Sequence, residues 1–397
     1  MNPTAIAKID DIDVAGKRVL VRVDLDVPMK NGEIVDDTKI RNILPTVEHL
    51  QSRDARVILM SHLGTPEGKV VPHLSLEKVA CRLAELLPNG EVLLTDACIG
   101  DGARRVSLDL RDGEVAVLEN LQFHVGETLN DEKFARQLAA LGDVYINEAF
   151  SILHLKHSSI AGVPRYMQKR AKGLLLADEL NAFSQLMGKV ERPFVAILGG
   201  ETVLLKINLL QKLFERADVV ILGGHMAVTF MAAKRMSMGQ TLFDSNMLPL
   251  ARDLMAKASA QQVRILLPND VIVADDLESS TCQVVPTDRI DTGKHVVDIG
   301  PRSRTIFKEA ISRAETIFWD GVMGEMTQDA FSEGTLAVAR AIAGSPAFSV
   351  LGGADTFFAV KKFGLEKGFN HVSRGGEASL DLLAGRQLLG LKALEKK

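Results

Sequence analysis

Cysteine is scarce in this chain of 397 residues, which has Cys81, Cys98 and Cys282 in isolated positions without the spacing of a metal site. A chain with so few cysteines is not built on a disulfide framework, and we expect buried, inert thiols in a reducing compartment. The nine histidines are also scattered, and only His154 and His157 are spaced to share a helical face. The sequence therefore predicts no cysteine–histidine metal centre.

Long apolar runs and an excess of one charge are missing as well. No apolar run reaches the roughly 18–20 residues that a membrane helix needs. The 47 basic and 51 acidic residues leave a net charge of −4, which argues against a nucleic-acid or membrane-surface partner. The first residues include acids where a secretory signal is basic and then apolar. We expect a cytoplasmic, monomeric protein with no nucleic-acid or membrane partner.

The first half of the chain alternates strand-like and helix-like segments. Apolar, β-branched runs predict strands over residues 17–25, 55–63, 114–120 and 143–150. Amphipathic patterns that open near Asp or Ser predict helices over residues 36–53, 75–87 and 131–141. Such alternation indicates βαβ units and a parallel sheet.

In the second half, a short apolar run stops four times at two adjacent glycines, and a helix-like segment follows each time. The pairs are Gly199–Gly200, Gly223–Gly224, Gly352–Gly353 and Gly375–Gly376. Glycine lets the backbone come close to a ligand, and the following helix offers free N–H groups and the positive end of its dipole. Four such turns predict a sheet whose carboxyl edge faces a polyanion, most simply a nucleotide.

Length and pattern together predict an α/β fold with two Rossmann-like lobes that contain parallel sheets. The expected parts are a first lobe (1–171), a hinge helix (172–189), a second, nucleotide-binding lobe (190–385) and a tail (386–397) that packs back on the first lobe or frays. This architecture suits a hinge-bending kinase, in which two sheet edges across a cleft hold two substrates and exclude water on closure.

Nine segments occur in an order that resembles one known family along nearly the whole chain. They are RVDLDVP (22–28), SHLGTP (61–66), LENLQFHVGE (118–127), YINEAFSILHLKHSS (145–159), RPFVAILGGETVLLKI (192–207), LPNDVIVAD (267–275), TIFWDGVMG (316–324), LGGADT (351–356) and SRGGEASLDLLAG (373–385). Together they resemble phosphoglycerate kinases. The resemblance implies a first lobe that holds a phosphorylated three-carbon acid in a basic patch and a second lobe that holds Mg²⁺ with ATP. It also implies reversible phosphoryl transfer between ATP and a carboxylate.

For the second lobe, the resemblance implies that Lys206 reaches the ATP phosphates and that Asp355 with Thr356 serves the metal and the phosphates. Lys206 and Asp355 are the expected catalytic residues, and Asp355 is the expected Mg²⁺ contact. The glycine pairs named above, with Thr202, are expected to bind the nucleotide. Thr202 stands where the family has a lysine that steadies the moving phosphoryl group, and loss of one such charge costs about 10²–10³ in rate.

Other positions in the second lobe also depart from the family pattern. The W-N-G-P motif of the family reads Trp319–Asp320–Gly321–Val322 here. Thr327 stands where an acid usually meets the ribose, and Glu325 lies two residues earlier. Glu377 replaces the third glycine of the last glycine-rich turn, where its carboxylate either repels the phosphates or points outward.

The first lobe departs further from the family pattern, because most of its substrate-facing arginines are replaced. Lys39, Thr65, Gln122 and Leu155 stand at expected arginine positions, and Asp26 replaces an asparagine. Together with the retained acid and histidine, the expected acid-binding set is Asp24, Asp26, Lys39, His62, Thr65, Gln122 and Leu155. An arginine–anion bond is worth about 1.5–3 kcal/mol, so three losses cost up to roughly 4–9 kcal/mol if they add. A doubly anionic phosphoglycerate is therefore expected to be a poor ligand.

Three functional hypotheses remain open at this point. The first is an ATP-dependent phosphotransferase that converts a small carboxylic acid other than 3-phosphoglycerate into an acyl phosphate, with ATP or ADP and Mg²⁺. The second is a catalytically degenerate paralogue that acts as a binding or regulatory module, which Thr202 and Glu377 favour. The third is an ordinary glycolytic phosphoglycerate kinase with rearranged contacts, in which Arg41, Lys156 or Arg374 replaces the missing arginines.

Overall fold

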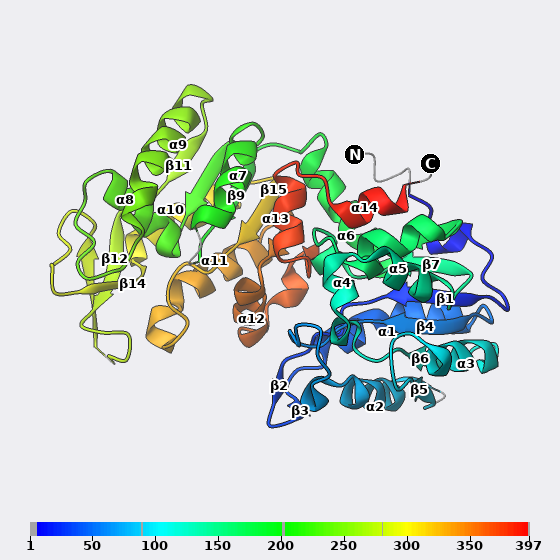
Figure 1. Ribbon diagram of the computed structural model, residues 1–397. Helices are drawn as coiled ribbons and strands as arrows, with labels where there is room; N and C mark the ends of the chain where they lie inside the picture. The colour runs from blue at the N-terminus through cyan, green and yellow to red at the C-terminus, as the bar shows by residue number, and fades with distance from the viewer. Residues whose placement is uncertain (1–5, 89, 201–202, 280, 396–397) are drawn as a thin grey trace. The chain divides into compact units, whose positions relative to one another are not determined.

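The computed structural model describes residues 6–88, 90–200, 203–279 and 281–395 (Figure 1). The chain folds into two compact units, which are described separately below. The first unit contains Met1–Asn181 and Gln387–Lys397, and the second contains Ala182–Arg386. The chain passes from the first unit to the second within helix α6 (Leu174–Met187).

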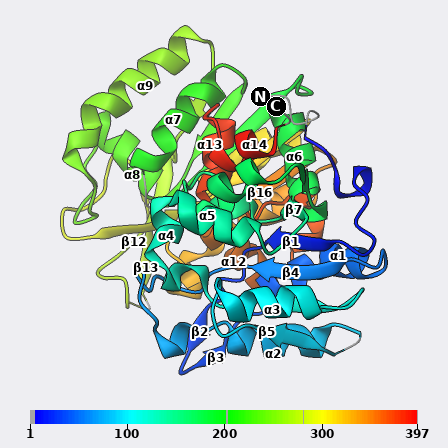
Figure 2. The same ribbon diagram turned by 45° about the vertical axis from the view of Figure 1, so that its right-hand side comes forward.

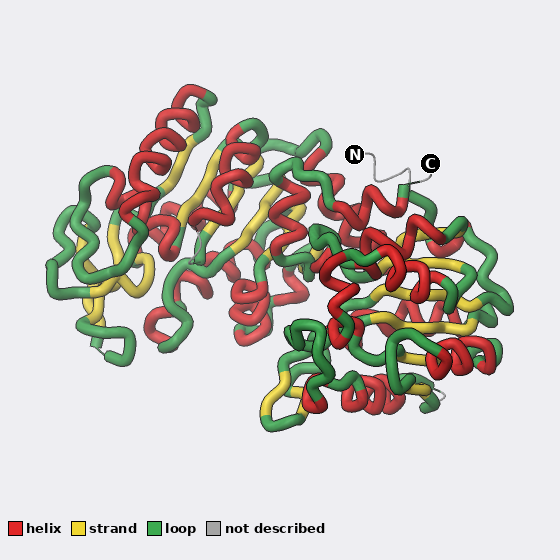
Figure 3. Tube along the Cα trace, viewed as in Figure 1, coloured by secondary structure: helices red, strands yellow, loops and turns green. Residues whose placement is uncertain are grey.

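The first unit is built on a six-stranded sheet in the order β5-β6-β4-β1-β7-β8, with every neighbouring pair parallel. The strands are β1 (Arg18–Arg22), β4 (Arg56–Met60), β5 (Val92–Leu94), β6 (Val115–Val117), β7 (Val144–Asn147) and β8 (Lys169–Lys172). The helices are α1 (Thr38–Gln51), α2 (Glu77–Leu86), α3 (Asp101–Asp109), α4 (Val125–Leu129) and α5 (Glu132–Ala139). A short hairpin of β2 (Met29–Lys30) and β3 (Glu33–Ile34) precedes α1. Figure 3 shows this alternation of strands and helices along the chain.

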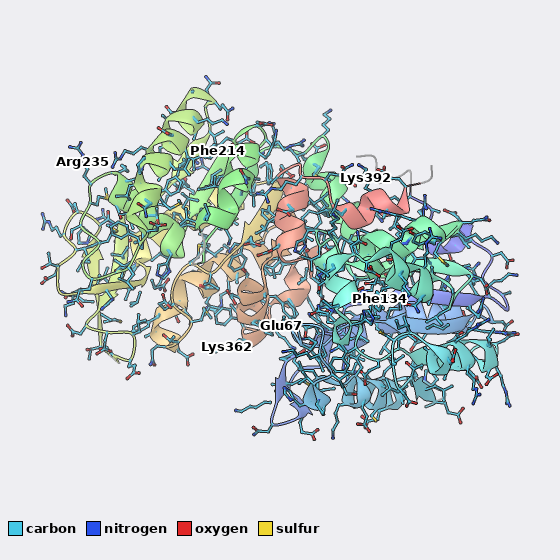
Figure 4. All side chains as sticks on the ribbon, viewed as in Figure 1. Glu67, Phe134, Phe214, Arg235, Lys362 and Lys392 are labelled. Carbon is cyan, nitrogen blue, oxygen red and sulfur yellow. The ribbon has the colours of Figure 1, made fainter. Side chains whose placement is uncertain are left out.

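The core of the first unit forms because alternate strand residues meet the apolar faces of α1 and α2. Val19 and Val57 share a register position on adjacent strands and are fully buried. Ile43 and Val47 of α1 belong to the same buried cluster. Phe134 on α5, labelled in Figure 4, is also buried and stacks on His124 with ring centroids 4.4 Å apart. Burial of such apolar side chains provides most of the driving force for folding.

The second unit has its own six-stranded parallel sheet, in the order β11-β10-β9-β15-β16-β17. The strands are β9 (Phe194–Leu198), β10 (Val219–Leu222), β11 (Arg264–Leu266), β15 (Thr316–Asp320), β16 (Phe348–Gly352) and β17 (His371–Val372). The helices are α7 (Val203–Phe214), α8 (Gly224–Ala233), α9 (Leu248–Ala260), α10 (Pro301–Ser312), α11 (Glu333–Ala343), α12 (Ala354–Lys362) and α13 (Glu377–Leu383). Helices α7, α8 and α9 contact one another (Figures 1 and 2). Helix α11 contacts both α10 and α12 (Figure 1). The α/β fold with parallel sheets predicted from the sequence is confirmed.

A separate antiparallel sheet in the second unit was not predicted from the sequence. It consists of β12 (Asp270–Ala274), β13 (Cys282–Pro286) and β14 (His295–Ile299), in the order β13-β12-β14. Strand β13 is mostly exposed, so it lacks the apolar run that marks a buried strand. Cys282 on this strand and Cys81 on α2 are exposed, so the expectation of buried thiols was wrong for both. Only Cys98 is buried, and burial raises the pKa of its thiol to about 12.

Some element boundaries also differ from those expected. The predicted strands at 17–25, 55–63, 114–120 and 143–150 continue beyond the ends of β1, β4, β6 and β7. The following segments still contain buried apolar side chains, namely Leu25, Leu63, Leu118 and Phe150, which extend the apolar pattern. The helix expected from residue 172 begins at Leu174, because Lys172 is the last residue of β8. Strand β8 has the polar sequence KRAK, which carries no strand pattern.

The end of the chain lies in the first unit as helix α14 (Leu389–Leu394). The amide of Gly390 donates to the carbonyl oxygen of Leu153 at 2.9 Å. A Cβ atom at Gly390 would lie 2.3 Å from a methyl group of Leu153, so a larger residue there would require that side chain to move. Leu391 and Leu394 are fully buried. No helix among the described residues is long and apolar enough to cross a membrane.

Each parallel sheet has a point at which the strand order reverses. In the first unit the chain moves outward from β1 to β4 on one side and places β7 on the other side of β1. In the second unit it moves outward from β9 to β10 and later places β15 on the other side of β9. Ligands of open α/β sheets bind beyond the carboxyl ends of the strands at such points. The fold therefore identifies the ends of β1 and β7, and of β9 and β15, as the places to look for sites.

Glu148, directly after β7, is a buried, hydrogen-bonded carboxylate in the first unit, and its titration gives a prediction for stability. Its carboxylate accepts hydrogen bonds from the hydroxyl of Thr46 and from the amides of Leu175 and Leu176 at 3.2 and 2.8 Å, at the start of α6. Burial, opposed by these bonds, raises the pKa of Glu148 from 4.5 to about 7. The folded state therefore binds this proton more tightly, so the stabilisation is complete below about pH 4.5 and is lost as the pH rises through 7.

We expect the Glu148→Gln variant to gain stability relative to the wild type by up to roughly 3 kcal/mol between pH 4.5 and pH 8, because glutamine does not titrate. Urea unfolding at several pH values measures this difference. Glu91→Gln, at an exposed acid, is the matched control and should show a difference that does not change with pH. A Glu148→Gln difference that is equally independent of pH would contradict the assignment.

Candidate functional site

The carboxyl edge of the second unit is formed by backbone segments in very close contact. The amide of Gly199, after β9, donates to the carbonyl oxygen of Asp320 at the end of β15, at 2.9 Å. A Cβ atom on Gly199 would lie 2.1 Å from the carbonyl oxygen of Val322. Gly321 has φ +103° and would place a Cβ atom 2.2 Å from the carbonyl carbon of Gly199. Only glycine fits at these two positions, so backbone atoms meet directly at the switch point.

Lys206 closes this edge from the first turn of α7. Its Nζ atom donates to the carbonyl oxygens of Gly199 at 2.8 Å and Asp320 at 3.1 Å, and lies 2.5 Å from Oδ1 of Asp320. The Lys206 and Asp320 side chains are 8% and 4% exposed, so this ion pair is buried. Ion pairs of this kind are held mainly by the additional hydrogen bonds that satisfy both partners.

The other predicted nucleotide-binding residues lie at the same sheet edge. Gly223–Gly224 follows β10, Gly352–Gly353 ends β16, and Gly375–Gly376 follows β17. Gly353 and Gly376 adopt left-handed φ values of +80° and +50° immediately before α12 and α13. Thr202 lies outside the described residues.

Asp355 and Thr356, at the start of α12, have different surroundings. Asp355 is exposed and lines a cavity, whereas Thr356 is fully buried. The Thr356 hydroxyl accepts a hydrogen bond of 2.7 Å from the amide of Gly321. Thr356 thus stabilises the contact between Gly199 and Gly321, which we call the glycine edge. Asp355, in contrast, presents its charge to the cavity.

A cavity of about 630 Å³ opens beside this edge, within the second unit. Its walls are mostly apolar and come from β12, β14, α8, α12 and the loop after β15. They include Val228, Met231, Val271, Val297, Met323 and Phe358. Apolar walls with a few placed polar groups are typical of a site for a small organic ligand, and the volume is in the usual range.

The polar groups of this cavity were mostly not identified from the sequence. His225, directly after Gly223–Gly224, and Glu325 line it with their Nδ1 and Oε1 atoms 4.0 Å apart. Lys362, the last residue of α12 and labelled in Figure 4, also lines it. The only available signal for His225 was its position after a glycine pair, and Glu325 was noted only as a neighbour of Thr327. Thr327 itself lines the cavity and is exposed.

Asp298 of β14 also lines the cavity but is used internally. It accepts hydrogen bonds from the amides of Ile299 at 2.7 Å and Gly334 at 2.6 Å, and Arg304 lies 3.4 Å away. Burial, opposed by these contacts, raises the pKa of Asp298 to about 7. Gly334 has no room for a side chain, because a Cβ atom would lie 2.1 Å from Oδ1 of Asp298. This carboxylate therefore holds the start of α11 rather than a ligand.

The second unit fits a magnesium ion that arrives with a nucleotide. No group of three or more His, Cys, Asp and Glu side chains that could hold a metal is found among the described residues. Mg²⁺ usually binds proteins through one or two carboxylates and takes its other ligands from phosphates and water. Asp355, exposed at the start of α12, is a carboxylate of that kind.

In the first unit, the switch point is occupied by Asp24, which follows β1. Its Oδ2 atom accepts a hydrogen bond of 2.6 Å from the hydroxyl of Ser151, which follows β7. Its carboxylate is 2.9 Å from Nζ of Lys39 on α1. Burial alone would raise the pKa of Asp24, but Lys39 and Ser151 hold it below the usual value. The positive charge of Lys39 is therefore neutralised by Asp24 within the protein.

His62 and Asp26 lie next to this pair. Oδ1 of Asp26 accepts a hydrogen bond of 2.8 Å from the amide of Gly64, and its Oδ2 is 4.0 Å from Nε2 of His62. Burial, followed by the charge of Arg22, lowers the pKa of His62 to about 4. At neutral pH, His62 is therefore uncharged and adds no cation to the site.

Arg22 is fully buried beneath these residues and satisfies groups inside the unit. It donates to Oγ of Ser159 at 2.7 Å, and to the carbonyl oxygens of Val23 and of Met60 at 3.2 Å. Ser159 in turn donates to Glu127 at 2.5 Å. Arg22 therefore serves as a buried hydrogen-bond donor and does not face an anionic substrate.

The remaining predicted acid-binding residues lie in loops after β4, β6 and β7. Thr65 is exposed, Gln122 is buried and Leu155 is partly buried. Of the proposed substitute cations, Arg41 pairs with Asp37 at 2.9 Å, Lys156 is exposed, and Arg374 lies over the ring of Phe357 at 5.0 Å. Glu377 is exposed at the start of α13.

Comparison with known proteins identifies related sequences along the whole chain. The sequence matches the family described as phosphoglycerate kinase over residues 9–386. The phosphoglycerate kinase of Anaeromyxobacter sp. (strain K) is 44% identical over 396 residues, covering 99% of this chain and 100% of the relative. That of Pelotomaculum thermopropionicum is 45% identical over 390 residues, covering 98% and 99%.

Solved structures show the same similarity. The phosphoglycerate kinase from Coxiella burnetii matches with a TM-score of 0.89 and 36% identity, covering 98% of both chains. The enzyme from Pyrococcus horikoshii OT3 matches with a TM-score of 0.84 and 30% identity, again covering 98% of both.

The glycine edge gives a stability prediction. Gly199→Ala should destabilise the second unit by roughly 3 kcal/mol, because its methyl group would meet the backbone carbonyl of Val322. Gly102→Ala, on α3 where nothing lies within 4 Å of the added atom, should instead stabilise by about 0.5–1 kcal/mol. Urea unfolding followed by fluorescence of Trp319, the single tryptophan, measures the first, and circular dichroism measures the second. Equal effects of the two substitutions would contradict the packing.

Proposed function

The chain belongs to the phosphoglycerate kinase family, and on that premise we propose that it transfers a phosphoryl group reversibly between ATP and the carboxylate of a small acid. The observation that carries the proposal is the 630 Å³ cavity beside the glycine edge of the second unit, in a chain that matches the family over residues 9–386. The product in the ATP-consuming direction is an acyl phosphate.

The second unit supplies the nucleotide half of this function. The apolar walls suit a base, and the carboxylate of Glu325 suits hydroxyl donors of a sugar. The amides of Gly199, Gly200, Gly223 and Gly224 already donate to carbonyl oxygens of the protein. The start of α12, which follows Gly352–Gly353, is therefore the turn proposed to offer backbone N–H groups to phosphates. Asp355, beside the cavity, is the carboxylate proposed to contact the metal.

The first unit supplies the acid half, at Asp24, Asp26, Lys39 and His62. Relatives at 44–45% identity are named phosphoglycerate kinase, so the comparisons favour 3-phosphoglycerate over the different acid expected from the missing arginines. An ordinary phosphoglycerate kinase with rearranged contacts is accordingly the first form of the proposal. It requires that cations at the loop surface, such as Lys156, replace the arginines.

The charges of the first unit favour a second candidate, an acid with less negative charge than 3-phosphoglycerate. Lys39 is paired with Asp24, Arg22 is fully buried, and His62 is neutral at neutral pH. The Asp26 carboxylate, 39% exposed, adds a negative charge at the same edge. A phosphate ester brought to this point would lose hydration without gaining a charge-assisted bond from these groups.

The chemical step needs no covalent intermediate with the protein. One carboxylate oxygen of the acid attacks the terminal phosphorus of ATP, that P–O bond forms, and the bond from phosphorus to the bridging oxygen of ADP breaks. The bonding electrons remain on the ADP oxygen. Mg²⁺, when bound, neutralises charge on the phosphates. The residues of this chain hold the reactants and position donors at the phosphate oxygens, and such positioning is the main source of rate in phosphoryl transfer.

The proposed activity is tested by measuring ADP formation with ATP, Mg²⁺ and 3-phosphoglycerate, in parallel with a panel of unphosphorylated small carboxylic acids and hydroxylamine to trap acyl phosphates. Turnover with 3-phosphoglycerate would establish the first form, and turnover only with another acid would establish the second. If no acid supports turnover while calorimetry detects Mg²⁺–ATP binding, the protein is a binding module and the proposal is wrong.

Thr65→Arg tests whether missing guanidinium groups limit the use of phosphoglycerate. Thr65 is exposed in the loop after β4, next to Gly64, whose amide binds Asp26, so an arginine fits without displacing the core. We expect kcat/KM for 3-phosphoglycerate to rise roughly tenfold or more, since one arginine–anion bond is worth about 1.5–3 kcal/mol.

Two matched variants separate this effect from others. Thr65→Gln adds length without charge, and Val70→Arg adds the same charge at a position of the same loop that is 76% exposed. Neither should change kcat/KM more than about twofold, since exposed charges beyond contact distance are screened. An equal gain in Val70→Arg would show that general charge, and not a bond at the strand end, limits the reaction.

A further inference from the structure

Lys206 has no hydrogen-bond donor left over for a ligand. A lysine ammonium carries three N–H donors. In this structure Nζ has three acceptors within reach: the carbonyl oxygen of Gly199 at 2.8 Å, that of Asp320 at 3.1 Å, and Oδ1 of Asp320 at 2.5 Å. The whole residue is only 6% exposed. Lys206 therefore binds its own protein fully in this arrangement.

Asp320, in contrast, has an oxygen without a partner. Oδ2 of Asp320 is buried and has no hydrogen-bond partner among the described residues. It lies over the Gly352–Gly353 turn, where added Cβ atoms would be 2.9 and 3.1 Å away. A buried acceptor that is left unpaired costs free energy, and such groups in native proteins usually have a functional reason. The oxygen is held at the switch point, beside the Gly352–Gly353 turn that is proposed to receive phosphates.

We propose that Asp320 is a positioning residue that keeps Lys206 in an internal ion pair and thereby weakens the binding of free nucleotide phosphates at this sheet edge. A phosphate can recruit Lys206 only by displacing the Asp320 carboxylate, and it meets a second negative oxygen there. The inference rests on the proposed function, because it takes nucleotide phosphates to be the anions that reach this edge.

The strength of the effect follows from burial. Two charges attract or repel far more strongly in a buried site than in water, because the effective dielectric constant is lower. The carboxylate therefore both holds Lys206 and opposes an incoming anion. An asparagine at this position would keep one oxygen for Lys206. It would replace the unpaired oxygen with an N–H group that can donate a hydrogen bond to an anion.

The inference also predicts a dependence on metal. A divalent cation on the phosphates reduces their repulsion from Asp320, so wild-type protein should prefer Mg²⁺–ADP to free ADP more strongly than a variant without this carboxylate. This preference is a property of binding and can be measured without turnover.

The test is calorimetric titration of ADP, with and without Mg²⁺, into wild type, Asp320→Asn, Lys206→Met and the double variant. We expect Asp320→Asn to bind metal-free ADP about tenfold more tightly or better and Lys206→Met to bind it about tenfold more weakly. The double variant should bind metal-free ADP more weakly than Asp320→Asn, because it keeps the loss of repulsion but has no ammonium to release. Asp275→Asn removes a carboxylate from the exposed 2.6 Å pair with Lys294 in the same unit and should change affinity less than twofold.

A merely structural ion pair gives a different pattern. In that case Asp320→Asn and Lys206→Met both lower the melting temperature and both weaken ADP binding or leave it unchanged, and the inference is wrong. Failure of the inference is separable from failure of the proposed function. Wild type that turns over while Asp320→Asn shows no gain in affinity refutes only the inference. Tighter ADP binding by Asp320→Asn in a protein without turnover supports the inference and counts against the function.

Discussion

The buried ion pair between Lys206 and Asp320 is the interaction on which the second unit's candidate site depends. It lies where β9 and β15 separate, and the ammonium connects the carbonyl oxygens that end both strands. Gly199 and Gly321 bring these backbones into direct contact, so neither strand end can shift without breaking the pair. The glycine edge, which a nucleotide would meet, is therefore held in place, but the Lys206 ammonium beside it is already hydrogen-bonded to the protein.

The first unit follows the same principle at its own switch point. Asp24 after β1 accepts from Ser151 after β7 and pairs with Lys39, while Arg22 satisfies groups beneath them. In both units the charged residues nearest the switch point are neutralised by partners within the protein. An anion that binds at either proposed site would therefore have to compete with a carboxylate of the protein.

Much of the fold could be predicted from the sequence because local patterns determine it. The apolar runs before Gly199–Gly200 and Gly223–Gly224 predicted buried parallel strands, and both pairs follow such strands at the carboxyl edge. Strand β8 was missed because its sequence, KRAK, is polar, and strand β13 was missed because it is mostly exposed and carries no buried apolar run. The resemblance to phosphoglycerate kinases agreed with the family match, but the substrate argument built on missing arginines is not favoured by the relatives' names.

The chemistry of the candidate site was harder to predict, because it depends on contacts between distant positions. Lys206 and Asp320 are 114 residues apart, and no local pattern shows that the lysine turns back toward the strand ends. The resemblance places His62 in the acid-binding set, but only its burial in the folded chain shows that it is neutral at pH 7. Such properties follow from burial and partner geometry, which only the folded chain defines.

The central claim is that the Lys206 ammonium is fully hydrogen-bonded inside the unliganded protein. NMR detection of side-chain ammonium protons in ¹⁵N-lysine-labelled protein tests it most directly, with Lys206→Arg used to assign the signal. The account predicts a Lys206 ammonium signal that exchanges slowly with water at neutral pH and shifts when Asp320 is replaced by asparagine. An ammonium that exchanges as fast as those of exposed lysines, with no response to that substitution, would contradict it.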